Sequence, residues 1–129
     1  MKNYPHFNEL EDFLNDIDKE NLSLVVLFGS LTKGTFTQHS DIDMLCVYDK
    51  EFKDMRERFL QSYRFSKGLV QPETITLQEF KDNLSEGNSF LYHILDEGYI
   101  LYNKILESTL KSWIEEGKKN LNTIYFPPS

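Results

Sequence analysis

The most informative stretch of this 129-residue chain is Leu27–Asp49, which reads "LFGSLTKGTFTQHSDIDMLCVYD". Gly29 and Ser30 end one apolar run, and two aspartates, Asp41 and Asp43, open the next one. If that second run is extended, both carboxylates point to the same face, because side chains alternate along a strand. Two like charges held side by side repel each other. The pattern therefore predicts a cation or strong hydrogen-bond donors between these two aspartates.

The runs on either side of this polar connection have the character of buried strands. "LSLVVLF", residues 22–28, is continuously apolar and rich in β-branched side chains, which suits a strand buried on both faces. "DIDMLCVYD" is the next predicted strand, and "GLVQPETIT" is a third. Pro72 lacks an N–H group, so the third strand is predicted at an edge of the sheet or irregular there. "YILY", residues 99–102, is predicted as a short edge strand.

Further segments repeat apolar residues at helical spacing. Asp49 is the predicted cap of the second such helix, and Thr76 with Glu79 forms a capping box for the third. Gly87 and Gly98 are predicted to end the third and fourth helices. The predicted inward-facing residues are, helix by helix, Phe7, Leu10, Phe13, Leu14 and Ile17; Phe52, Met55, Phe59 and Leu60; Leu77, Phe80 and Leu84; Phe90, Leu91, Ile94 and Leu95; and Leu106, Leu110, Trp113 and Ile114.

The alternation of helices and strands predicts one α/β (α+β) domain in which helices flank a small mixed sheet. We assign residues 1–120 to this domain and residues 121–129 to a C-terminal tail. In the tail, Ile124, Tyr125 and Phe126 precede two prolines and are predicted to lie outside a helix. They are expected to fold back on the domain or to dock on a partner.

Composition and charge indicate which partners the protein is not expected to bind and where in the cell it is expected to be. The formal net charge is −7, and no basic stripe is visible, so long nucleic acid is not an expected partner. The sequence contains no uninterrupted run of about 18 apolar residues, which is the length that a membrane-spanning helix needs. The acidic amphipathic N-terminus is unlike a signal peptide. The single cysteine, Cys46, lies in an apolar run and is expected to be a buried free thiol. Together these features predict a cytoplasmic protein.

Residue chemistry suggests what the polar connection binds. A loop that leaves a strand at Gly29-Ser30 offers N–H groups and a hydroxyl to phosphate oxygens, and glycine permits close approach. Asp41 and Asp43 offer the hard oxygen ligands that Mg²⁺ prefers. Thr35 stands where a P-loop requires lysine, which excludes that type of phosphate site. Phosphate donors beside metal-binding carboxylates predict a site for a nucleoside triphosphate and its metal.

The spacing of these residues also resembles a known family. Gly29-Ser30, ten intervening residues and then Asp41-x-Asp43 is similar to the signature of the DNA-polymerase-β-like nucleotidyltransferase superfamily. The fuller stretch "GSLTKGTFTQHSDIDMLCV", with a basic residue and glycine at Lys33-Gly34, resembles its minimal nucleotidyltransferase branch. The resemblance implies transfer of a nucleoside monophosphate with pyrophosphate leaving. It implies that Gly29 and Ser30 hold the terminal phosphates, that Lys33 contacts phosphate, and that Asp41 and Asp43 bind a pair of Mg²⁺ ions.

The chain departs from that family at one position. A third carboxylate usually lies on the third strand, and the corresponding residue here is Gln71, which is neutral and cannot act as a base. Glu73 lies two residues further on the same strand face and is our candidate for that catalytic role. The alternative is an inactive site.

The same resemblance suggests acceptors and partners. Members of the branch are commonly paired with an all-helical toxin, and some transfer AMP from ATP to a tyrosine of it. The leading hypothesis is therefore an antitoxin that acts as a protein AMP-transferase. The alternatives are an inactive antitoxin that binds its partner stoichiometrically, and nucleotidyl transfer to a small molecule. A homodimer is the alternative to a toxin-like partner.

Overall fold

The computed structural model of the chain describes residues 7–29, 42–66 and 70–125. The element order agrees with the predicted alternation of helices and strands. The elements are α1 (Phe7–Asp16), β1 (Leu22–Phe28), β2 (Ile42–Tyr48), α3 (Met55–Tyr63), β3 (Val70–Thr76), α4 (Leu77–Ser85), α5 (Ser89–Glu97), β4 (Tyr99–Asn103) and α6 (Glu107–Tyr125).

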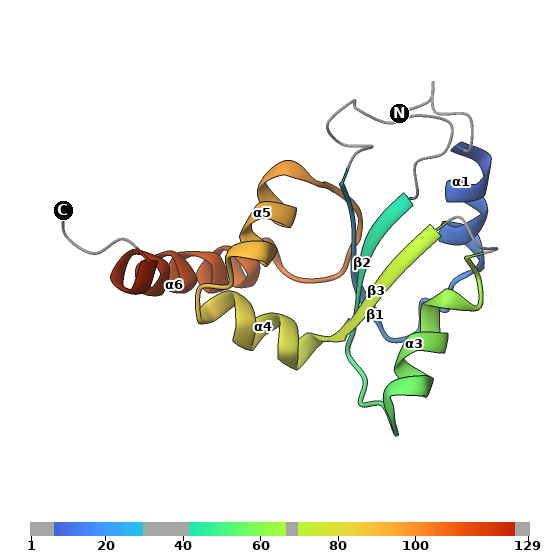
Figure 1. Ribbon diagram of the computed structural model, residues 1–129, viewed down its shortest axis with the longest axis horizontal. Coiled ribbons are helices and arrows are strands. Elements are labelled where there is room, and N and C mark those ends of the chain that lie inside the picture. Colours follow the sequence, from blue (N-terminus) through green and yellow to red (C-terminus); the bar gives the residue numbers. More distant parts are fainter. Residues whose placement is uncertain (1–6, 30–41, 67–69, 126–129) are drawn as a thin grey trace.

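The strands form one mixed sheet in the order β3-β2-β1-β4 (Figure 1). β1 pairs antiparallel with both β2 and β4, whereas β2 and β3 are parallel. The two strands predicted at edges, β3 with its Pro72 and the short β4, do lie at the two edges. The most apolar strand, β1, has a neighbour on each side, and its residues Leu22–Leu27 are buried, as its unbroken hydrophobic run predicted.

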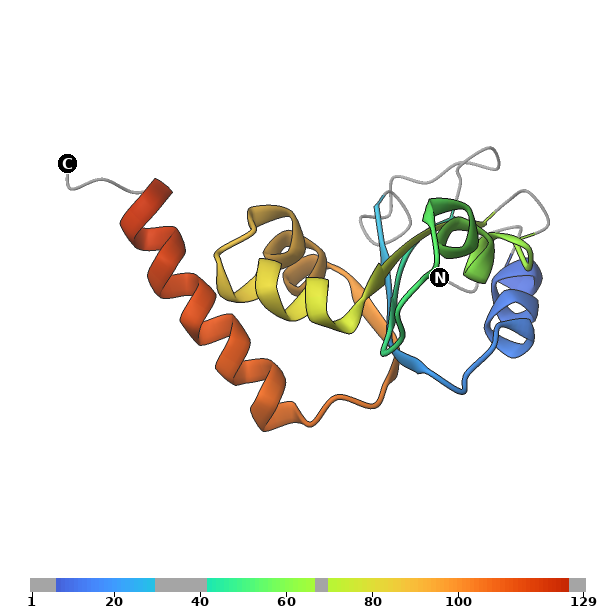
Figure 2. The same cartoon turned by 90° about the horizontal axis from the view of Figure 1, so that it is seen from below.

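Helices cover both faces of the sheet, so the domain has three layers. α1 and α3 lie on one side, and α4, α5 and α6 lie on the other (Figures 1 and 2). Alternate residues of β2 enter different cores: Met44, Cys46 and Tyr48 pack on the α1 side, and Leu45 and Val47 pack on the α4–α6 side. The same alternation directs Asp43 toward the α4–α6 side. This places the aspartate on the face that α5 covers.

The second helix differs from its prediction. α3 begins at Met55, and its N-cap is Asp54, whose carboxylate accepts a hydrogen bond from the Glu57 backbone N–H at 2.8 Å. Asp49 was therefore the wrong cap. Three of the predicted inward residues are exposed instead of buried: Met55 by 71%, Phe59 by 53% and Leu60 by 38%.

A buried polar cluster explains why α3 faces the other way. Ser62 of α3 is completely buried, and its hydroxyl lies 2.9 Å from the Tyr48 hydroxyl of β2 and accepts a hydrogen bond from the Thr74 hydroxyl of β3. Buried hydroxyl groups need such partners, because leaving them unpaired costs about 1–3 kcal/mol. The helix therefore turns Ser62 inward, and its apolar residues face solvent.

Three smaller expectations also need correction. α6 continues to Tyr125, so Ile124 and Tyr125 lie in a helix, while Phe126 lies outside the described residues. The reason is that proline restricts mainly the residue directly before it, which is Phe126 here. Leu106 precedes α6 and is 72% exposed, and Phe90 of α5 is 49% exposed, although both were expected to be buried.

The thiol of Cys46 is predicted to be inert in the folded protein. Cys46 is fully buried, and burial raises the pKa of its thiol from 9.0 to about 12. A higher pKa means less of the reactive thiolate, by about a thousandfold at pH 8, and burial also blocks access. We expect no labelling by a thiol reagent in buffer and complete labelling in denaturant. Rapid labelling of the native protein would contradict this burial.

The contact between α4 and α6 is predicted to tolerate no side chain at Gly117. A Cβ there would overlap the Leu84 carbonyl oxygen and the Tyr92 hydroxyl, which also donates a hydrogen bond to the Ile114 carbonyl at 2.7 Å. Alanine improves helix propensity by about 1 kcal/mol, but overpacking costs about 1–3 kcal/mol. We therefore expect Gly117→Ala to lower the free energy of unfolding by up to about 2 kcal/mol.

Urea denaturation of the Gly117→Ala variant checks this expectation, with Lys118→Ala as its control. Lys118 is the next residue on α6 and is exposed, so its truncation should change the free energy of unfolding by less than about 0.5 kcal/mol. Equal stability of the two variants would show that the helices can separate without cost.

Candidate active site

The sheet register brings two predicted site residues, Gly29 and Asp43, next to Gln71, the residue that stands where the family has its third carboxylate. Phe28, the residue before Gly29, is paired with Asp43 across the antiparallel β1–β2 ladder. Asp43 is in turn paired with Gln71 across the parallel β2–β3 ladder. Paired residues of adjacent strands place their Cβ atoms about 4.5–5.5 Å apart on the same face. Asp43 therefore lies between the end of β1 on one side and Gln71 on the other.

Gly29 is in direct contact with the Asp43 carboxylate. Its φ is +88°, a conformation that other residues rarely adopt. A Cβ at this position would lie 2.5 Å from Asp43 Oδ2 and 3.3 Å from its carboxyl carbon. Two independent constraints, the backbone conformation and the packing, thus require glycine where β1 ends. The missing Cβ is also what allows the carboxylate to lie close to the backbone at Gly29.

Gln71 and Glu73 of β3 lie at different distances from the Asp43 carboxylate. Gln71 is the residue in register with Asp43, whereas Glu73 is in register with Leu45. One two-residue step along a strand is about 6.6 Å, so Glu73 shares the face of Gln71 but lies farther from Asp43. Glu73 is exposed and borders a cavity of about 330 Å³ together with Leu45 and Phe28.

Three predicted residues lie outside the described part of the chain. These are Ser30 and Lys33, the predicted phosphate contacts, and Asp41, the predicted second metal ligand. Within the described ranges, no group of three or more His, Cys, Asp and Glu side chains could hold a metal ion. The Asp43 carboxylate and the Gln71 amide nevertheless offer oxygen atoms on neighbouring strands and one face. Such hard oxygen donors fit Mg²⁺, which uses one or two carboxylates from the protein.

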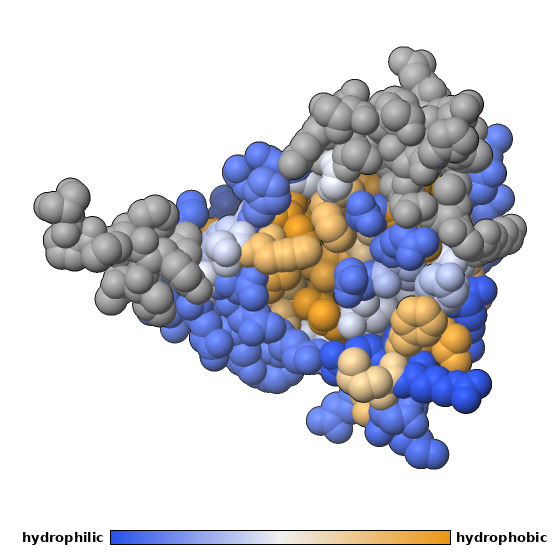
Figure 3. Space-filling view, viewed as in Figure 1, coloured by the Kyte–Doolittle hydropathy of each residue, from blue (hydrophilic) through white to orange (hydrophobic). Residues whose placement is uncertain are grey.

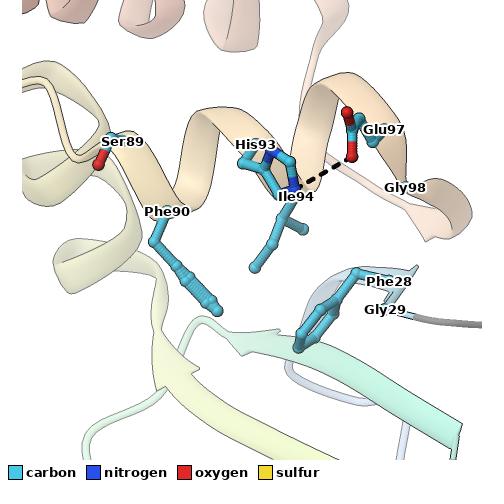
Figure 4. A pocket seen from close by; sticks show the side chains of 8 residues that line it. All are labelled: Phe28, Gly29, Ser89, Phe90, His93, Ile94, Glu97 and Gly98. Carbon is cyan, nitrogen blue, oxygen red and sulfur yellow. Dashed lines mark ion pairs between the residues drawn. The ribbon is translucent and has the colours of Figure 1, made fainter.

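A second cavity, of about 550 Å³, opens beside Gly29. It lies between the end of β1 and α5, and Figure 4 shows Phe90 and Ile94 of α5 directed toward Phe28. His93 and Glu97 of α5 also line this cavity, and His93 Nε2 and Glu97 Oε2 form a contact of 3.0 Å. Sequence reasoning did not identify Phe90, His93 or Glu97 as site residues. Local spacing does not mark them, because their position depends on the close packing of Gly98, which ends α5, against Leu27 of β1.

The surface around the two cavities is apolar. Figure 3 shows hydrophobic side chains gathered in a hollow between the α4–α5 helices and the strands, with hydrophilic residues around it. The residues that border both cavities are Phe28, Phe90 and Ile94. The site thus combines a carboxylate held at strand ends with an apolar groove next to it, which is the general character of small-molecule sites.

Among the helices in the described part of the chain, none has the length and apolar composition needed to cross a membrane.

Comparison with known proteins identifies the family. The sequence model of the nucleotidyltransferase domain matches residues 8–120. A Methanocaldococcus jannaschii protein that is named as a protein adenylyltransferase is 30% identical over 99 residues, covering 72% of this chain and 94% of its own length.

Solved structures share the fold at lower sequence identity. A chain of a toxin–antitoxin complex solved with AMP-PNP has a TM-score of 0.57 and 19% identity, with 90% of this chain and 89% of that chain covered. A chain from the complex of tri-AMPylated Shewanella oneidensis HEPN toxin with MNT antitoxin has a TM-score of 0.52 and 17% identity, with 90% and 86% covered. A Sulfolobus solfataricus nucleotidyltransferase has a TM-score of 0.50 and 22% identity, with 75% and 76% covered. With its sheet order, its glycine–aspartate contact and the match over residues 8–120, the chain belongs to the nucleotidyltransferase domain family.

Proposed function

We propose that this protein transfers AMP from ATP to a hydroxyl group of a protein partner, with Mg²⁺ as cofactor. The observation that carries the proposal is the contact between Gly29 and the Asp43 carboxylate at adjacent strand ends. It holds one acidic side chain directly beside the backbone that would receive phosphate. The relative named as a protein adenylyltransferase supports AMP as the transferred group and a protein as the acceptor.

Each candidate residue has a distinct task in this reaction. The backbone at Gly29, the Ser30 hydroxyl and the Lys33 ammonium group would bind the triphosphate. Asp41 and Asp43 would hold the Mg²⁺ ions, which when bound neutralise phosphate charge and lower the pKa of the acceptor hydroxyl. The Gln71 amide would orient a group beside Asp43 through neutral hydrogen bonds.

The chemical step is a displacement at the α-phosphorus of ATP. The acceptor oxygen forms a bond to this phosphorus, the bond to the bridging oxygen of the β-phosphate breaks, and pyrophosphate leaves. The acceptor proton must go to a base, and Glu73 is the candidate because it shares the face of Gln71. It lies on the β3 side of Asp43, opposite to Gly29 on β1. We therefore expect the acceptor to approach from the β3 side.

We infer that the acceptor is a tyrosine on a helical toxin-like partner. The solved complexes that share this fold pair a toxin with an antitoxin, and in one of them the toxin is tri-AMPylated. Those complexes support the proposal through their fold, and the matched chains are covered over 86% and more of their length. This chain would then act as the antitoxin by modifying its partner.

Intact mass of the co-purified partner, after incubation with ATP and Mg²⁺, tests the proposed function. We expect an increase by one or more AMP units with the wild-type protein and none with Asp43→Asn. Asp16→Asn is the matched control, because Asp16 is an exposed residue at the end of α1, on the opposite face of the sheet. Modification that persists in Asp43→Asn would remove this carboxylate from the mechanism.

One observation favours a second candidate function, stoichiometric neutralisation of the partner without catalysis. The residue in register with Asp43 on β3 is the neutral Gln71, which cannot accept the acceptor proton. In that case the wild-type complex forms and neutralises the toxin, but no AMP appears on the partner. Toxicity measured with Asp43→Asn separates the two functions, since binding alone would survive this substitution.

A further inference from the structure

The cavity between β1 and α5 extends beyond the groups that act in the proposed transfer step. Its volume is about 550 Å³, within the range of small-molecule sites. It begins at Gly29, so it is continuous with the backbone that would bind the triphosphate. A molecule whose phosphates lie at Gly29 can therefore place its remaining part in this cavity.

An aromatic ring is presented on one wall of the cavity. Phe90 is 49% exposed, although it lies on a helix whose neighbouring residues Leu91 and Ile94 are buried. Its ring lies 5.8 Å from that of Phe28 in an edge-to-face arrangement with an interplanar angle of 69°. Such a pair keeps aromatic surface available to a third planar group. Figure 4 shows both rings directed toward the space between α5 and β1.

Polar groups lie at the rim above these rings. His93 and Glu97 follow Phe90 on α5, and their ion pair leaves 59% and 46% of the two side chains exposed. An imidazole and a carboxylate together offer both donors and acceptors of hydrogen bonds. A flat apolar wall with mixed hydrogen-bonding groups at its edge matches the chemistry of a nucleobase, which has π faces and a polar edge.

We propose that this cavity holds the nucleoside part of the nucleotide, with the base stacked on Phe90 and its edge at His93 and Glu97. The inference rests on the proposed function, because it extends the same nucleotide site. The sheet order separates the two ligands: the cavity adjoins β1, and the candidate base Glu73 lies on β3, with Asp43 of β2 between them. The nucleotide thus lies on the β1 side and the acceptor on the β3 side.

Binding of two ligands to the full-length protein tests this assignment. Isothermal titration calorimetry in the presence of Mg²⁺ measures the Kd of ATP and of inorganic tripolyphosphate, which has phosphates but no base. We expect Phe90→Ala to raise the Kd of ATP about tenfold, equivalent to about 1.4 kcal/mol of binding free energy, and to leave the Kd of tripolyphosphate unchanged. Phe90→Tyr keeps a ring and should retain ATP affinity. Phe59→Ala is the matched control, because Phe59 is 53% exposed on α3.

A second pair of variants distinguishes the two cavities, since Phe90 borders both. His93 borders the 550 Å³ cavity and Asn83 the 330 Å³ cavity. His93→Ala should raise the Kd of ATP severalfold, and Asn83→Ala should leave it unchanged. The reverse result would place the base in the smaller cavity and overturn the inference. Equal losses for ATP and tripolyphosphate in Phe90→Ala, or unchanged ATP binding, would also overturn it.

Failure of this inference can be told apart from failure of the proposed function. If ATP binding depends on Phe90 but AMP never reaches the partner, the base site stands and the transferase proposal fails. If AMP is transferred and Phe90→Ala raises the KM of the acceptor instead of that of ATP, the cavity binds the acceptor and the inference is overturned. If the wild-type protein binds no ATP, both are overturned.

Discussion

Replacing Gly29 by alanine should lower the rate of AMP transfer about a hundredfold while leaving the chain folded. The new Cβ would lie 2.5 Å from Asp43 Oδ2, so the carboxylate must move. A displacement of about 1 Å in a catalytic group costs about a hundredfold in rate. The φ of +88° adds backbone strain of about 1–2 kcal/mol, which a domain of this size can tolerate. Partner modification followed by mass spectrometry, with circular dichroism for folding, measures both effects.

Gly87→Ala is the control for the Gly29 substitution. Gly87 also has a positive φ, +91°, but it lies in the turn between α4 and α5, away from the strand ends that carry Gly29 and Asp43. The two variants should therefore lose similar stability, and only Gly29→Ala should lose activity. Full activity of Gly29→Ala would mean that the position of the Asp43 carboxylate does not limit the reaction.

Replacing Glu73 by glutamine should lower kcat about a hundredfold and leave the Kd of ATP unchanged. The carboxylate is our candidate acceptor of the hydroxyl proton, and a positioned general base contributes about 10²- to 10⁴-fold. Glutamine keeps the size of the side chain and removes its basicity. Because Glu73 is exposed at a sheet edge, the substitution should change stability by less than about 0.5 kcal/mol. Single-turnover rates with saturating ATP measure the effect.

A carboxylate introduced at position 71 provides a second test of whether Glu73 is the general base. Gln71 is the residue in register with Asp43, so Gln71→Asp places a carboxylate nearer the candidate metal ligand. Combined with Glu73→Gln, it should restore part of the lost rate. Glu86→Gln, an exposed change beyond the end of α4, should have no effect. If Glu73→Gln is as fast as wild type, another group accepts the proton.

Much of the fold could be predicted from the sequence because its strands are strongly apolar. The predicted range of β1 agrees with the structure, and the capping box from Thr76 to Glu79 opens α4 as expected. α3 was predicted with its wrong face inward. Helical periodicity shows which residues share a face, but the need of buried Tyr48 and Thr74 for the Ser62 hydroxyl determined which face turned toward the sheet. That need depends on contacts between segments far apart in the chain.

The candidate site could be predicted only in part for the same reason. Local spacing was enough to single out Gly29 and Asp43, and strand pairing places them in contact. The residues of α5 could not be identified in this way, because their position depends on how the helix crosses β1. That crossing is close, since a Cβ at Gly98 would lie 2.6 Å from the Leu27 carbonyl oxygen. Whether Gln71 or Glu73 adjoins Asp43 also required the β2–β3 register.

The proline in the edge strand has a consequence for how polypeptides can associate with this domain. β3 forms one of the two edges of the sheet, and Pro72 lies within it, between Gln71 and Glu73. A strand added by another molecule along this edge would find no N–H donor at Pro72, so the ladder would be interrupted beside the candidate site. The edge therefore resists intermolecular sheet extension and aggregation, and an acceptor is expected to reach Asp43 with a projecting side chain instead of a paired backbone.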